Sequence, residues 1–227
     1  MYLTILQEDE HILVCAKPVG LAVQTARPAQ QDCVSILKNH ISRQSPGSAP
    51  YLSVVHRLDQ PVSGVLVFAK TKQAAADLSR QLGQGIAHKE YYALCAGVPE
   101  EKQGELIHRL GKDPVSGKAV VFPADDEKGK QARLIYEVIG EKEGCGLLRI
   151  RLLTGRFHQI RAQLSAAGHP LLGDFKYGNA ESVSFSKERS LCHPALCARR
   201  LVFTHPATGK TMEITMPKED TPGWLSE

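Results

Sequence analysis

The stretch VVHRLDQPVSGVLVFAKT, residues 54–71, decides how this chain folds. It begins and ends like an apolar strand, yet its middle carries His56, Arg57, Asp59 and a proline. Burying a charged side chain is costly unless the charge is paired. The pattern therefore predicts two strands joined by a charged turn, which is either held by a structural ion pair or forms the mouth of an active site.

The composition is that of an ordinary globular protein, with 42% hydrophobic and 23% charged residues among 227. Lys and Arg exceed Asp and Glu by four, which suits a polyanionic partner without requiring one. No run approaches the roughly 20 apolar residues of a membrane span. The N-terminus does not resemble a signal peptide, and the six cysteines form no CxxC pair. We therefore expect a cytoplasmic protein with reduced thiols and no membrane contact.

Apolar runs and turn residues predict a strand-rich α+β fold with a mostly antiparallel sheet. No long linker or repeat interrupts the chain, so we expect one domain over residues 1–227. The expected elements are two short strands within 1–24, helices at 32–42 and from 71, strands at 51–55, 62–70 and 89–97, strand hairpins over 104–153, a helix from 155, a loop at 174–192 and a closing hairpin at 198–217.

Several common enzyme signatures are missing from the sequence. GKDPVSGKA at 111–119 has five residues between its glycines where a P-loop has four. Neither GxSxG nor GxGxxG occurs. Cys192, His193 and Cys197 lack the second ligand pair of a typical zinc site, so we expect no metal.

A second group of candidate residues lies in TGRFHQIRAQL, residues 154–164. A Thr-Gly turn leads into a predicted helix whose first turns carry Arg156, His158 and Arg161. Helix N-termini attract anions, and basic side chains there favour binding of a phosphate or a carboxylate. The alternative is a solvated basic helix end, although helix starts more often carry acidic residues.

Two single residues have equally plain structural explanations. On the local sequence alone, a structural role explains Asp59 as well as a catalytic one: Asp59 would cap its own loop, and Arg57 would point into solvent. Tyr91 lies on the predicted strand 89–97, where a core role is the simpler explanation, although an aromatic ring can also stack on a base.

In combination, five segments resemble the RluA family of pseudouridine synthases, in the family's order and at fitting intervals. The segments are EDEHILVCAKPVGLAVQ, HRLDQPVSGVLVFAKT, KEYYALCAG, TGRFHQIRAQLSAAGHPLLGDFKYG and ARRLVFTHPATG. The resemblance covers nearly the whole chain. Two departures stand out: Val62 replaces the usual Thr, and no N-terminal S4 domain is expected, as in the compact members.

The resemblance implies a mixed, mostly antiparallel sheet with a central RNA-binding cleft flanked by helices and loops. It also implies an enzyme that converts uridine to pseudouridine in ribosomal or transfer RNA without cofactor or metal. Separately, we expect a monomer. By the motif match, Asp59 is the catalytic carboxylate, Tyr91 packs on the uracil and takes part in removing a proton, and Arg161 pairs with Asp59. Arg57 would fill the space left by the flipped nucleotide. The residues expected to bind the substrate are His56, Arg57, Arg156, His158, Gln159 and Leu201.

Two other functions compete with this interpretation. One is an inactive or chaperone-like RNA-binding protein of the same fold. The other is a hydrolase that combines Asp59 with His56 or His158, for which the sequence offers no suitably placed second carboxylate.

Overall fold

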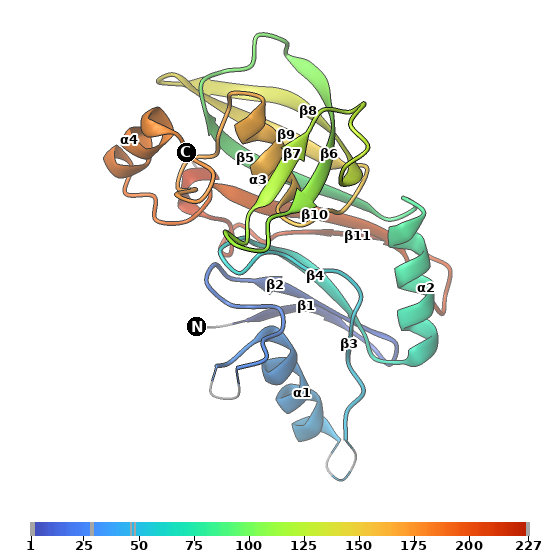
Figure 1. Cartoon of the computed structure of the whole chain (residues 1–227). Coiled ribbons are helices and arrows are strands. Elements are labelled where there is room, and N and C mark those ends of the chain that lie inside the picture. The colour runs from blue at the N-terminus through green and yellow to red at the C-terminus, as the bar shows by residue number, and fades with distance from the viewer. Residues whose placement is uncertain (1–2, 28–29, 46, 48, 226–227) are drawn as a thin grey trace. The chain divides into compact units, whose positions relative to one another are not determined.

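The chain forms two compact units, shown in the cartoon of the computed structural model (Figure 1). The first comprises Met1–Lys89 and Ala198–Glu227, and the second comprises Glu90–Cys197. A single domain over the whole chain stays a prediction. The structure describes residues 3–27, 30–45, 47 and 49–225.

The first unit consists of a sheet and two helices. Its strands are β1 (Thr4–Glu8), β2 (Ile12–Lys17), β3 (Ser53–Val54), β4 (Ser63–Ala69), most of β10 (Leu196–Thr204) and β11 (Thr211–Thr215). Their order is β1-β2-β4-β10, with β3 on β4 and β11 on β10. The pairs β1–β2, β2–β4, β3–β4 and β10–β11 are antiparallel.

Strands β2 and β4 lie in the middle of this sheet, and every one of their residues is buried. An uninterrupted apolar run is the sequence pattern of a strand covered on both faces. Gly64 in β4 has a φ of +146°, and a Cβ placed on it would lie 2.4 Å from the Cβ of Ala198. Only glycine fits this close approach of β4 to β10, directly after the charged turn.

Both helices of the first unit begin as the sequence predicts. Helix α1 (Cys33–Gln44) starts after Asp32, whose carboxylate accepts from the N–H of Ser35 in a capping box. Helix α2 (Lys72–Gly83) starts after Thr71, whose hydroxyl accepts from the N–H of Ala74. Helix α2 packs against β3 and β4. A short 3₁₀ turn, Gly223–Leu225, ends the described chain.

The second unit is an antiparallel sheet with helix α3 (Gln159–Ala166) packed against β6 and β7. Its strand order is β5 (His88–Ala96), β9 (Cys145–Leu152), β8 (Lys130–Lys142), β6 (Gln103–Lys112) and β7 (Ala119–Phe122). Helix α4 (Ala180–Glu188) follows in the chain. Leu134, Leu148 and Ile150 are completely buried in this unit, and Leu164 is nearly so.

The predicted α+β class and its mostly antiparallel sheet are confirmed, with three corrections. The strand expected after Gly20 does not form: Leu21 and Val23 are buried, but Ala22 makes only an isolated bridge to Asp32, and the first strand pair is instead β1 with β2. The loop expected at 174–192 contains α4, which Asn179 caps through a capping box with Ser182.

The third correction concerns the start of α3. The helix begins at Gln159, so Arg156 and His158 precede it rather than lie on its first turns. His158 has a φ of +52°, in the left-handed region that a right-handed helix excludes.

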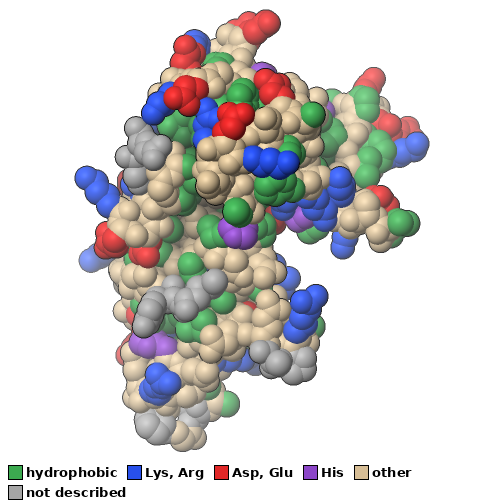
Figure 2. Space-filling view, turned by 90° about the vertical axis from the view of Figure 1, so that its left-hand side faces the viewer, with side chains coloured by type: hydrophobic (Ala, Val, Ile, Leu, Met, Phe, Trp, Pro, Cys, Tyr) green, Lys and Arg blue, Asp and Glu red, His purple; other side chains and the backbone are tan. Residues whose placement is uncertain are grey.

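The surface carries charges of both signs. On the face in Figure 2, Lys and Arg side chains are interspersed with Asp and Glu. Within the described residues, no helix has both the length and the apolar character needed to cross a membrane.

Candidate active site

The Asp59 turn is closed by the backbone. The N–H of Val62 donates to the carbonyl of Asp59 over 3.0 Å, which forms a tight turn between β3 and β4. The Val62 side chain is only 2% exposed, and Leu58 is also buried. A hydroxyl at position 62 is therefore not needed to close the turn, which answers the question raised by valine in place of threonine.

Lys17 connects this turn to the chain that follows β2. It is fully buried, and its Nζ donates to three backbone carbonyls: Pro18 at 3.0 Å, Leu21 at 2.8 Å and Gln60 at 3.1 Å. The last of these belongs to the residue directly after Asp59. One ammonium group therefore holds both turns, and its three donors are matched by three acceptors.

Lys17 stays protonated at neutral pH although it is buried. Burial lowers the pKa of Lys17 to about 8, and the nearby Cys33 and Asp59 side chains act in the opposite direction. The ammonium form therefore prevails at pH 7.

Gln60 makes the contact between the two turns reciprocal. The N–H of Gly20 donates to the carbonyl of Gln60 over 3.0 Å, and the Gln60 amide donates back to the carbonyl of Gly20 over 2.9 Å. Gly20 has a φ of +85°, which glycine adopts without strain. The KPVG sequence thus forms a fixed support for the Asp59 turn.

His56 is neutral and part of this support. Its Nε2 accepts from the N–H of Val67 in β4 over 3.1 Å, so the proton of the neutral ring lies on Nδ1. That Nδ1 is shielded from solvent and has no hydrogen-bond partner among the described residues. Burial, assisted by the charge of Lys89, lowers the pKa of His56 to about 3. Contact of His56 with RNA stays a prediction.

Arg57 takes a different position in the same turn. Its side chain is exposed, and its Nη2 donates to the amide oxygen of Gln24 over 3.0 Å. An exposed guanidinium held by one neutral hydrogen bond is able to move to another acceptor at little cost. This mobility suits the expected role of Arg57 as a replacement for a flipped nucleotide.

Arg161 forms a buried, bidentate ion pair with Asp174. Its Nε and Nη2 donate to the two carboxylate oxygens over 2.6 and 2.8 Å, and both side chains are at most 6% exposed. The guanidinium also lies over the ring of Tyr177, 5.1 Å from the centroid. Fork-to-fork pairing fixes its orientation. The expected pairing of Arg161 with Asp59 would join the two units and stays a prediction.

The basic turn before α3 is held by Gln159. This buried side chain accepts from the Thr154 hydroxyl over 2.8 Å and from the N–H of Arg156 over 2.9 Å, and it donates to the carbonyl of Arg133 over 3.0 Å. These bonds use both ends of the Gln159 amide to position the turn. The Arg156 side chain is exposed and donates to the carbonyl of Gln131 over 2.9 Å.

Tyr91 and Leu201 are buried residues of two strands. Tyr91 is 5% exposed in β5, opposite Ile150 of β9. Leu201 is 1% exposed in β10, opposite Ile214 of β11. Their positions suit an apolar wall, and their contacts with a uracil stay predictions.

The structure adds three residues that the sequence analysis did not single out: Lys17, Asp174 and Tyr177. Each lies in a segment that carried the resemblance, in KPVG or in GDFKYG. For Lys17 and Asp174, the available signal was a charged residue within an otherwise apolar or glycine-rich segment; Tyr177 had no comparable signal. Among the described residues, no three His, Cys, Asp or Glu side chains gather as a metal site would require.

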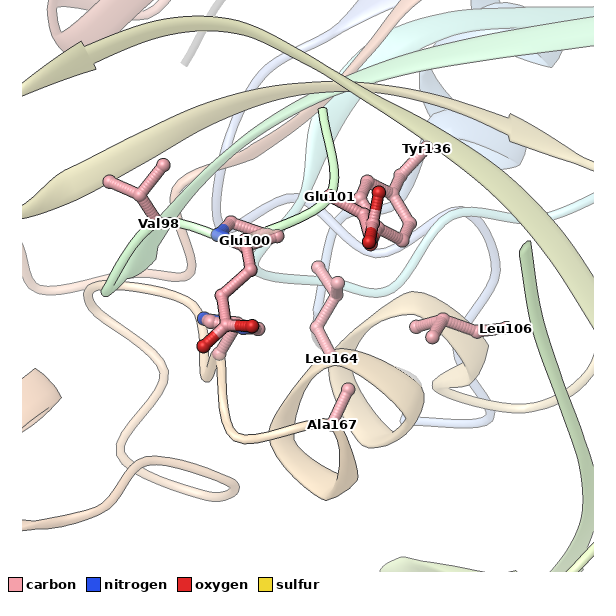
Figure 3. A pocket seen from close by; sticks show the side chains of 9 residues that line it. Val98, Glu100, Glu101, Leu106, Tyr136, Leu164 and Ala167 are labelled. Carbon is pink, nitrogen blue, oxygen red and sulfur yellow. The ribbon is translucent and has the colours of Figure 1, made fainter. Parts of the chain in front are cut away.

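A pocket of about 430 Å³ in the second unit does not include any of these site residues (Figure 3). It is lined by Val98, Pro99, Glu100, Glu101, Leu106, Tyr136, Leu164, Ala167 and His169. Two carboxylates at its edge repel phosphate groups, so this pocket does not suit an RNA backbone.

Comparison with solved structures defines the class of fold. The human RNA pseudouridylate synthase domain containing 4 matches 98% of this chain and 90% of its own, with a TM-score of 0.79 and 24% identity. The human RNA pseudouridylate synthase domain containing 1 matches with a TM-score of 0.74, also at 24% identity. The fold is therefore that of the pseudouridine synthases.

Comparison of sequences identifies the family. The model of the RNA pseudouridylate synthase family matches residues 11–166. The dual-specificity RNA pseudouridine synthase RluA of Salmonella typhi is 34% identical over 220 residues, which are 96% of this chain and 94% of the relative. This chain belongs to the RluA family of RNA pseudouridylate synthases, as the sequence motifs predicted.

Other relatives are longer than this chain. The ribosomal large subunit pseudouridine synthase D of Nitrosomonas europaea is 37% identical over 224 residues. That alignment covers 96% of this chain and 62% of the relative.

The buried Arg161–Asp174 pair should contribute far more to stability than an exposed pair does. Asp174→Ala leaves a buried guanidinium without the carboxylate that binds two of its nitrogens, so we expect a loss of about 3–5 kcal/mol in the free energy of unfolding. Urea denaturation measures this value. The matched control is Glu141→Ala, which removes the exposed Lys102–Glu141 pair and should cost at most about 1 kcal/mol. Equal losses for the two variants would contradict the assignment.

His56 should make the protein less stable in acid. Its folded pKa of about 3 lies below the usual value of 6.5, so the unfolded chain takes up the proton first as the pH falls. The stability due to neutral His56 is complete above pH 6.5 and is lost progressively toward pH 3, by roughly 1.5 kcal/mol between pH 6.5 and 5. His56→Gln keeps an acceptor for the Val67 N–H but does not titrate, so it should lack this loss. Parallel curves for the two proteins in urea denaturation would refute the burial of a neutral imidazole.

Proposed function

We propose that this protein converts uridine to pseudouridine in RNA and that Asp59 is its catalytic carboxylate. The observation that carries the proposal is the construction of the HRLD turn. Asp59 lies between two strands, in a turn that a buried ammonium and reciprocal backbone bonds hold in place. Rigid support of this kind suits a group that must meet one atom of a substrate.

The proposed reaction has three steps, followed by a proton transfer. The N1–C1′ glycosidic bond breaks, the uracil turns, and C5 bonds to C1′. C5 then loses its proton and N1 gains one, so that the net change is an isomerisation. A carboxylate near C1′ acts as a nucleophile or stabilises and deprotonates a sugar intermediate. Tyr91 packs on the uracil and takes part in removing the proton, and Leu201 contributes to the apolar wall.

The basic residues of the proposed site have two proposed roles. Arg161, oriented by Asp174, pairs with Asp59 and keeps it ionised in a dry pocket. Arg57 fills the space of the extruded nucleotide, whose unstacking costs a few kcal/mol. Arg156 and His158 bind the RNA backbone, and contacts with the phosphates offset that cost.

Ribosomal RNA is the proposed substrate, because several relatives are named ribosomal large subunit pseudouridine synthases. Transfer RNA is a second candidate from the sequence motifs. Action as a monomer in the cytoplasm, without a cofactor, is part of the same proposal. An inactive RNA-binding protein of this fold is less well supported, because Asp59, Tyr91 and Arg161 are all present.

The test is the release of tritium from C5-tritiated ribosomal RNA, prepared from cells that lack this protein. Asp59→Asn should abolish release, because an amide replaces the carboxylate, while RNA affinity changes by less than about twofold. Asp125→Asn alters an exposed aspartate of the second unit and serves as the matched control, with release expected at the wild-type rate.

Two results would contradict the proposal. Release by Asp59→Asn at the wild-type rate would remove Asp59 from the chemistry. RNA binding by the wild type without release from either ribosomal or transfer RNA would favour the inactive binding protein.

A further inference from the structure

An exposed aromatic ring lies directly before α3. Phe157 is 46% exposed and stacks on the ring of His158, with centroids 3.7 Å apart and planes 21° from parallel. The other neighbour of His158 is Tyr177, whose ring meets it edge-on at 5.6 Å and whose hydroxyl lies 2.8 Å from its Nδ1. Phe157 is thus the outermost of three rings that support one another.

The support beneath Phe157 is fixed by the β6–β7 hairpin. The Tyr177 hydroxyl accepts from the N–H of Ala119 over 2.6 Å and shares a second hydrogen bond with Nδ1 of His158 over 2.8 Å. Lys176 donates to the carbonyl of Gly117 over 2.7 Å. His158 keeps a φ of +52°, an uncommon backbone conformation for a residue other than glycine. A surface phenylalanine held in this way does not add to a core.

One basic side chain lies over the exposed ring, and a second lies over the ring of Tyr177. The Nζ of Lys112 lies over Phe157, 5.2 Å from its centroid, and the Nζ of Lys118 lies 6.0 Å from the centroid of Tyr177. Both lysines and Arg156 are exposed. Since His158 covers one face of Phe157, Lys112 covers the other. The lysine is attached by a flexible stem and can leave that face.

We propose that Phe157 is a stacking platform for an unpaired base of the RNA substrate, other than the uridine on which Tyr91 is proposed to pack. The base takes the place of Lys112 over the ring, and the lysine moves to a neighbouring phosphate. Stacking of a base on an aromatic ring is stronger than an exposed cation–π contact, so the exchange is favourable. The inference rests on the proposed function because it takes RNA as the ligand.

The arrangement suits single-stranded RNA better than an apolar protein partner. A platform for a base needs a ring face that the base can reach and a cation for the phosphate, and at Phe157 the displacement of Lys112 provides both. An apolar partner would instead have to bury the charges of Lys112, Lys118 and Arg156, which is costly.

The first experiment compares steady-state tritium release from C5-tritiated ribosomal RNA. Phe157→Ala should raise KM by about 5- to 50-fold, because stacking is lost, while kcat stays within about twofold. Phe157→Trp keeps an aromatic ring and should retain a KM near that of the wild type. Phe175→Ala is the matched control: Phe175 is 54% exposed and makes no ring or cation contact among the described residues. Equal KM values for Phe157→Ala and Phe175→Ala would overturn the proposal.

The second experiment observes stacking without requiring catalysis. Trp224 is the only tryptophan, so Phe157→Trp combined with Trp224→Phe reports from position 157 alone. Titration with the same RNA should quench this fluorescence as the complex forms, followed in parallel by filter binding. If RNA quenches the fluorescence of the double variant while the wild type releases no tritium, the proposed function is refuted but the platform is supported. Binding without quenching would overturn the platform alone, and absence of RNA binding would overturn both.

Discussion

The ammonium group of Lys17 is the interaction on which the rest of the site depends. A fully buried charge is tolerated only where its donors are matched, and here three backbone carbonyls match them. Two of these carbonyls belong to the turn after β2 and one to the turn that carries Asp59. A single cation therefore holds the backbone directly after Asp59 against the turn that follows β2.

The second unit repeats this principle with a different chemistry. Arg161 is held by Asp174 rather than by carbonyls, and its two-point pairing fixes the plane of the guanidinium. Asp174 also accepts from the N–H groups of Lys176 and Tyr177, so the acid that orients the arginine also shapes the turn bearing Tyr177. The same turn supports the stacked rings beneath Phe157. Ion pairing, turn geometry and the aromatic platform are thus parts of one construction.

Much of the fold could be predicted because its signals are local. Asp32 and Thr71 cap helices where the apolar period begins, and the alternation in β5 buries Tyr91. Helix α4 was missed because its buried positions are serines: Ser182 and Ser186 are held by hydrogen bonds, so no apolar period marks the helix.

The site was only partly predictable for a related reason. The family motifs indicated Asp59 and Arg161, but the partners that hold them are distant in sequence. Gln60 is 43 residues from Lys17, and Asp174 is 13 residues from Arg161. Such contacts are made by the tertiary fold, and no local period records them. The left-handed backbone of His158, which makes the helix start later than predicted, has the same origin.

The most direct test of this account is the rate of tritium release by Lys17→Met, measured in a single turnover beside RNA affinity. Methionine keeps the length of the side chain but donates to none of the three carbonyls, which loosens the link between the Asp59 turn and the turn after β2. The account predicts a folded variant that binds RNA like the wild type and reacts about 10- to 100-fold more slowly. A folded variant that reacts at the wild-type rate would contradict it.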